Sequence, residues 1–160
     1  TILGTGTSHG IPVIGCECPV CTSTDPRNHR YRCSALLSYQ GRSVLIDTAT
    51  ELRLQAIRAG MRDLDALLVT HSHADHVGGL DDVRAFSERR GAPIPVSGDE
   101  ACLDDVRRRR AYVYTGPRTP GGGEPRRERT PTAGPLAPTG RSATPAPEPG
   151  RGRLPPLRYP

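Results

Sequence analysis

Four residues of the metal-binding type occur within six consecutive positions of this chain, directly after an apolar segment. Residues 65–70 are apolar on both faces, as in a strand that is covered on both sides, and a His-x-His-x-Asp-His motif follows them. Residues two apart on an extended segment project the same way, so His71 and His73 can bind one metal ion. The turn that follows offers Asp75 and His76 to a second ion. A two-metal centre is preferred to a loop of solvated histidines, because four such ligands without a cation repel one another or go unused.

Short apolar segments alternate with helical patterns over the first 115 residues, which predicts an α/β fold. Residues 34–47 predict a hairpin that turns at Gly41, where glycine can adopt a positive φ. The spacing of Thr48 and Glu51 predicts a capping box at the start of the next helix. A short strand is expected at 94–96, and its proline favours a position at the sheet edge.

Residues 116–160 have a different composition from the rest of the chain. They carry 8 of the 22 arginines but only 3 of the 17 acidic residues, and 12 of the 17 prolines. Such a segment cannot bury enough apolar surface to offset the entropy of ordering, so we expect a domain over 1–115 and a disordered tail over 116–160. The arginines are not interleaved with aromatic residues that would stack on bases, so they do not favour nucleic-acid binding.

A second candidate metal site lies in the cysteine-rich stretch near the N-terminus. Cys16, Cys18 and Cys21 have a spacing that suits a tetrahedral structural zinc ion, which we prefer to metal-free thiols or a disulfide. A fourth ligand is missing, and His29 and Cys33 are the only nearby substitutes. The odd number of cysteines favours a reducing, cytoplasmic compartment. No apolar run approaches the ~18 residues that span a bilayer, so no membrane partner is expected.

The motif after the apolar segment resembles that of the metallo-β-lactamase superfamily. Further segments are similar to the branch that contains the phosphoribosyl cyclic phosphate phosphodiesterases; these are residues 4–12, 16–21, 46–48 and 79–86. The resemblance covers residues 1 to about 115. It implies an α/β fold that forms the N-terminal half of a metallo-β-lactamase-type αββα sandwich, in which the metals lie at the ends of two facing sheets.

The resemblance also implies roles for individual residues. His71 and His73 would be ligands of one divalent metal, zinc or manganese, and Asp75 and His76 ligands of a second, with Asp75 as the catalytic carboxylate. Asp47 would brace the site without binding metal. His9 lies in a turn that faces the site, where contact with a ligand or the substrate and a plain loop position are equally favoured. The implied activity is hydrolysis of a small cyclic phosphodiester by a water that two metals activate.

This sequence departs from the superfamily pattern after its first motif. The pattern continues with a histidine, a metal-bridging aspartate and a late histidine, whereas all five histidines here lie at or before His76 and no aspartate follows residue 115. We therefore expect weak activity, in a copy that is truncated, frameshifted or degraded, unless a homodimer supplies the missing ligands. The alternative function is a non-catalytic zinc-binding module whose basic tail contacts nucleic acid.

Overall fold

A single mixed sheet organises the chain, in a computed structural model that describes residues 1–115 and 151–157. Side chains are described for residues 1–113. The sheet has the strand order β1-β2-β3-β4-β5-β6, with β3, β4 and β5 parallel and the other neighbours antiparallel. The strands are β1 (Ile2–Gly4), β2 (Ser34–Tyr39), β3 (Arg42–Ile46), β4 (Ala66–Val69), β5 (Ile94–Asp99) and β6 (Arg151–Leu157). The helices are η1 (Pro26–Asn28), α1 (Leu52–Arg58), α2 (Ala74–Val77), η2 (Leu80–Val83), α3 (Arg84–Arg90), α4 (Glu100–Arg109) and α5 (Ala111–Thr115).

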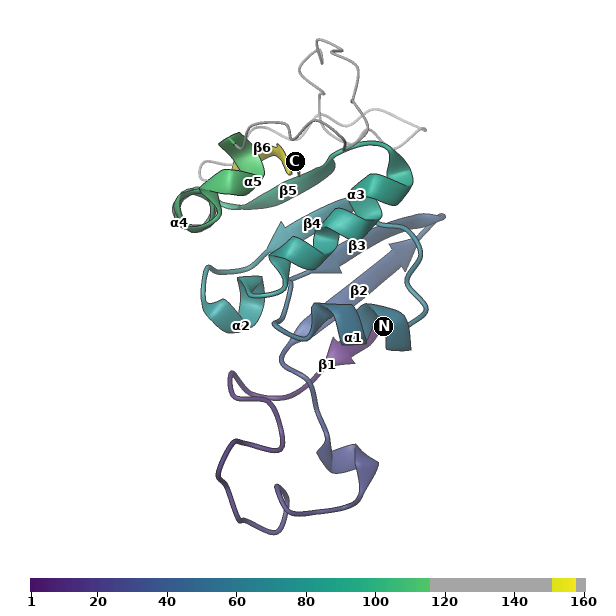
Figure 1. Ribbon diagram of the computed structural model, residues 1–160. Coiled ribbons are helices and arrows are strands. Elements are labelled where there is room, and N and C mark those ends of the chain that lie inside the picture. Colours follow the sequence, from purple (N-terminus) through teal and green to yellow (C-terminus); the bar gives the residue numbers. More distant parts are fainter. Residues whose placement is uncertain (116–150, 158–160) are drawn as a thin grey trace.

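Helices α1 and α3 cover one face of the sheet (Figure 1). The strand register places Leu45, Leu67 and Val96 side by side on that face, and each is at most 1% exposed. Leu52 of α1 and Phe86 of α3 belong to the same buried cluster. The predicted α/β architecture is confirmed, and burial of these apolar side chains is its main stabilising contribution.

The opposite face of the sheet is open among the described residues. Ile46 pairs with Leu68, which is 39% exposed, and Leu37 on β2 is 56% exposed. The prediction that segment 65–70 is covered on both sides is therefore wrong for this structure. Its alternating burial follows from the single helix layer, because Leu67 and Val69 point to the helices and Leu68 points away.

The C-terminal region partly contradicts the expected disordered tail. Residues 151–157 form β6, which pairs antiparallel with β5 and satisfies backbone groups that an edge strand would leave free. The edge position predicted for 94–96 is therefore also wrong. The register between the two strands shifts at Pro95, which has no N–H to donate, so the strand accommodates its proline at an irregularity. The rest of the predicted tail, 116–150 and 158–160, lies outside the described residues.

The local turn signals have mixed outcomes. The hairpin is confirmed, with φ of 47° at Gln40 and 73° at Gly41. The predicted capping box is wrong. Helix α1 begins after Glu51 without a hydrogen bond from a capping side chain, and Thr48 lies fully buried outside the helix. Among the described residues, no helix combines the length and the apolar character needed to cross a membrane.

Candidate metal centre

The histidine motif runs from the segment after β4 into the short helix α2, which contains Asp75 and His76 (Figure 1). One nitrogen each of His71 and His76 and one carboxylate oxygen of Asp75 lie within 4.8 Å of one another. The His76 Nε2 is 3.2 Å from Asp75 Oδ2, and the ring centroids of His71 and His76 are 3.7 Å apart. Two imidazoles and a carboxylate that converge in this way are a donor set that suits a divalent transition metal.

His73 lies beside this cluster but outside it. Its ring centroid is 4.9 Å from that of His71, its side chain is exposed, and it occupies the N-cap position of α2. The structure thus groups His71 with Asp75 and His76, whereas the sequence paired His71 with His73. The assignment of ligands to two separate metals stays a prediction.

Asp47, at the end of β3, organises the centre through hydrogen bonds. Its carboxylate is buried and accepts from the Thr70 amide at 2.8 Å, the Thr70 hydroxyl at 2.6 Å and His76 Nδ1 at 2.7 Å. A carboxylate only accepts, so the tautomer of His76 that carries its proton on Nδ1 fits this contact, and that tautomer leaves the Nε2 lone pair for a metal. The residue adopts a φ of 60°, a left-handed conformation that aspartate tolerates better than most residues.

The Thr70 hydroxyl extends this control to the second imidazole. Its single proton is donated to Asp47, so toward His71 Nδ1, 3.0 Å away, the hydroxyl oxygen can only accept. His71 therefore also carries its proton on Nδ1 and keeps Nε2 free. Thr70 could not be identified from the sequence, because a hydroxyl residue before the motif does not indicate a metal site.

Thr48, two residues after the end of β3, is joined directly to the motif. The amide and hydroxyl of Thr48 donate to the His76 carbonyl at 2.7 and 3.2 Å, and the Gly79 amide donates to the Thr48 carbonyl at 2.9 Å. A Cβ at Gly79 would lie 2.2 Å from the Ala49 carbonyl oxygen. Only glycine permits this approach, so Gly79 lets the backbone leave the site tightly.

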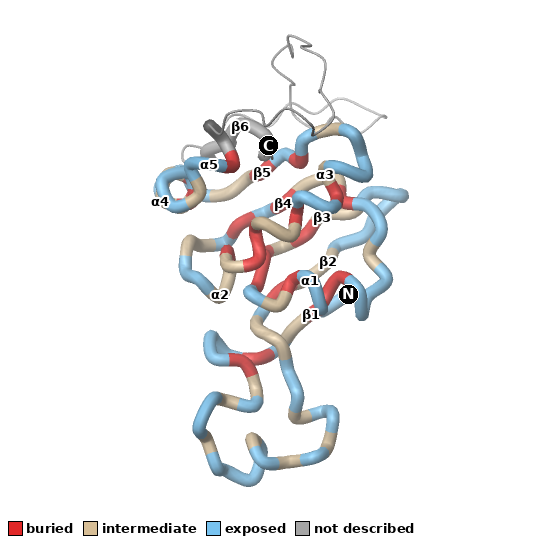
Figure 2. Tube along the Cα trace, in the orientation of Figure 1, coloured by how far each residue is buried: buried red, intermediate tan, exposed pale blue. Residues whose placement is uncertain are grey.

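The three cysteines form a second cluster, in the irregular segment between β1 and β2, which is mostly exposed (Figure 2). The sulfur atoms of Cys16, Cys18 and Cys21 lie within 4.8 Å of one another. The Cys21 backbone N–H and the Cys16 thiol stabilise the Cys18 thiolate and lower the pKa of Cys18 to about 7. Easier deprotonation favours metal binding at Cys18, whereas burial and the neighbouring Cys16 and Cys18 raise the pKa of Cys21.

The residues suggested as a fourth ligand make other contacts. His29 Nε2 lies 3.2 Å from the Ser23 carbonyl oxygen, and the Cys33 thiol donates to the Gly6 carbonyl at 3.2 Å. His9 is exposed, its amide lies 3.4 Å from the Thr7 hydroxyl, and it is not part of the histidine cluster.

Comparison with known proteins defines the class to which this fold and site belong. The Beta-lactamase superfamily domain matches residues 42–154, which include β3, β4 and the histidine motif. The chain therefore belongs to the metallo-β-lactamase superfamily, as the resemblance implied.

Two crystal structures are similar to this chain. A diphosphatase from the PhnP family is 45% identical and superposes with a TM-score of 0.69 over 71% of this chain and 46% of its own. Zn(2+)-bound PqqB from Methylobacterium extorquens is 26% identical, with a TM-score of 0.58 over 69% of this chain and 43% of its own.

The curated relatives are much longer than the part that this chain matches. Ribonuclease Z of Clostridium acetobutylicum is 34% identical over 54% of this chain and 29% of its own length. An octanoyltransferase of Porphyromonas gingivalis is 45% identical over 71% of this chain but only 23% of its own length. The chain thus spans less than half of each protein.

Proposed function

We propose that this chain carries the first metal-binding half of a metal-dependent hydrolase that acts on a small cyclic phosphodiester. The observation that carries the proposal is the convergence of ligand atoms from His71, Asp75 and His76. The similarity to a PhnP-family diphosphatase supports a phosphate-containing substrate. The similarity to ribonuclease Z makes RNA a substrate that the test must include.

The proposed centre holds two divalent ions, zinc or manganese. His71 and His73 bind one of them and Asp75 and His76 the other, with Asp75 as the catalytic carboxylate. When bound, such ions lower the pKa of a water and offset the negative charge that develops on a phosphoryl group. Asp47 and Thr70 hold the two imidazoles in the tautomer that exposes Nε2. His9 is proposed to contact a metal ligand or the substrate.

Metal content tests the proposed ligands directly. The unsubstituted chain should bind more zinc or manganese by elemental analysis than a His71→Ala/His73→Ala double variant. An Asp63→Asn variant, changed at an exposed carboxylate outside both clusters, serves as the control. Equal metal content in all three proteins would refute the site.

Turnover tests the proposed reaction. We expect weak hydrolysis of bis(p-nitrophenyl) phosphate and of a cyclic phosphodiester, because the further superfamily ligands have no counterpart in this sequence. Hydrolysis of RNA in preference to both would overturn the proposed substrate. Strong metal-dependent turnover that is abolished in His73→Ala would refute the expectation of weak activity. It would support a homodimer that supplies the missing ligands, and sedimentation would measure the mass of that dimer.

We also propose that Cys16, Cys18 and Cys21 hold a structural zinc ion. The short distances among their sulfur atoms and the lowered pKa of Cys18 support this site. Thiol titration should find these three groups protected until a chelator is added. Three thiols that react freely before chelation would refute it.

A further inference from the structure

The C-terminal end of α4 contacts the loop that carries the proposed metal ligands. We propose that Asp105 and Arg109 are positioning residues, which hold Ser72 and thereby set the direction of the imidazoles on either side of it. The inference rests on the proposed metal centre and deepens it, because it assigns a function to residues outside the ligand set.

The carbonyl and the hydroxyl of Ser72 are both held by one turn of α4. Arg109 Nη1 donates to the Ser72 carbonyl at 3.2 Å, and the Ser72 hydroxyl is hydrogen-bonded to the Asp105 carboxylate. Arg109 Nη2 also pairs with Asp105 Oδ2 at 2.8 Å, so the two residues, four apart on the helix, support each other. The hydrogen bond from Ser72 is the largest cause of the lowered pKa of Asp105.

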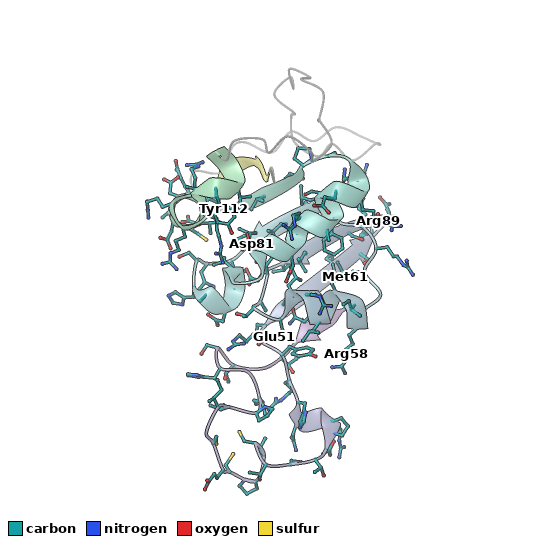
Figure 3. The ribbon with its side chains drawn as sticks, in the orientation of Figure 1. Glu51, Arg58, Met61, Asp81, Arg89 and Tyr112 are labelled. Atoms are coloured by element: carbon teal, nitrogen blue, oxygen red, sulfur yellow. The ribbon has the colours of Figure 1, made fainter. Side chains whose placement is uncertain are left out.

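The same region of the chain also contacts the far end of the loop. Arg110 Nη2 lies 3.5 Å from the Gly78 carbonyl oxygen, and its Nη1 lies 3.7 Å from Asp81 Oδ2. The Tyr112 hydroxyl donates to Asp81, and both side chains are labelled in Figure 3. The loop is thus held near its start by α4 and near its end by Arg110, which lies between α4 and α5.

Ser72 is well placed to influence metal binding although it is not a ligand. It lies between His71, which belongs to the converging cluster, and His73, which lies just outside it. A rotation of the Ser72 backbone would move both imidazoles at once. Groups that orient metal ligands from outside typically contribute 10- to 100-fold in affinity, and we expect about tenfold here because Arg109 is 55% exposed.

The chain offers matched controls on the same helix. Arg108 Nη2 lies 3.4 Å from Asp105 Oδ1, and Arg107 Nη1 lies 2.5 Å from Asp104 Oδ1. Neither Arg107 nor Arg108 has a hydrogen bond to the metal-binding loop among those of the described residues. A general effect of surface charge or helix stability would therefore appear in Arg107→Gln and Asp104→Asn as well.

The experiment is a zinc titration of the full chain. Binding is monitored through the imidazole signals of His71 and His76 in ¹H–¹⁵N spectra. These signals report on the histidine centre and not on the cysteine loop. Asp105→Asn and Arg109→Gln should each weaken zinc binding about tenfold. Arg109→Lys should recover part of the loss, and the two control variants should match the unsubstituted chain. Far-UV circular dichroism confirms that each variant is folded.

The outcomes separate this inference from the proposed function. Zinc affinities within twofold of the unsubstituted chain in Asp105→Asn and Arg109→Gln would refute the inference alone. An equal loss in the control variants would refute it too, because the effect would then be one of surface charge. If zinc leaves the His71 and His76 signals of the unsubstituted chain unchanged, the metal centre itself is refuted, and the inference with it.

Discussion

Replacing Asp47 by asparagine tests the hydrogen bonds that organise the metal centre. The substitution keeps the size of the side chain, and asparagine tolerates the φ of 60° at this position as aspartate does. It removes the charge and replaces one acceptor oxygen by an NH₂ group. Because Asp47 is only 5% exposed, water cannot fully replace the lost partners.

The expected magnitude follows from the three donors that meet this carboxylate. The amide oxygen can keep the bond from the Thr70 backbone, but the NH₂ group then faces the Thr70 hydroxyl and the His76 Nδ1 proton. Two donors lose a charged acceptor, at about 1–3 kcal/mol each, so the free energy of unfolding should fall by about 2–6 kcal/mol. His76 relieves the clash by moving its proton to Nε2, which blocks the proposed metal lone pair. Zinc affinity at the histidine centre should fall by about 10- to 100-fold.

Two measurements separate these effects. Urea unfolding of the metal-free protein gives the stability change, and zinc titration followed by the His76 imidazole signals gives the affinity and the tautomer. Asp63→Asn is the control, because it makes the same change in charge at a side chain that is 75% exposed. Unchanged zinc affinity and an unchanged His76 tautomer in Asp47→Asn would refute the role assigned to this carboxylate.

Three further predictions concern the cysteine loop, the glycines and the sheet. After chelation, the alkylation rate of Cys18 should rise with pH, with a midpoint at about 7 because its pKa is lowered to that value. Mass spectrometry of the labelled peptide measures the rate, and a midpoint near 9.0 would contradict the lowered pKa. Gly79→Ala places a Cβ 2.2 Å from a carbonyl oxygen and should lower the free energy of unfolding by at least about 1–3 kcal/mol. Gly91→Ala meets open space but keeps a φ of 66°, so it should lower the free energy of unfolding by about 1–2 kcal/mol. Leu67→Ala, on the covered face, should cost about 2–5 kcal/mol, and Leu68→Ala, on the open face, clearly less; equal losses in urea unfolding would mean that both faces are covered.

The fold was predictable from the sequence where one local pattern decided the outcome. Two apolar segments on either side of a glycine identify the hairpin about Gly41. The errors concern contacts between segments far apart in the chain. Residues 151–157 have a polar, proline-containing sequence that argues against a strand, yet the free edge of β5 supplies the hydrogen bonds that order them. Coverage of Leu68 likewise depends on which layers pack on the sheet, and a run of apolar residues does not encode that.

The candidate site shows the same division between local and distant information. The spacing of the motif suffices to identify its ligand-type residues, because all of them come from one short segment. The proton positions on His71 and His76 depend instead on Asp47, which is distant in the sequence. Two hydrogen bonds bring its carboxylate to the histidines: the Asp47 amide donates to the Leu68 carbonyl at 2.9 Å, and the Thr48 amide donates to the His76 carbonyl at 2.7 Å. A single carboxylate thus sets both imidazoles, one directly and one through the Thr70 hydroxyl. The consequence is a coupled site, in which loss of Asp47 should affect both histidines and loss of the Thr70 hydroxyl should affect His71 while sparing His76.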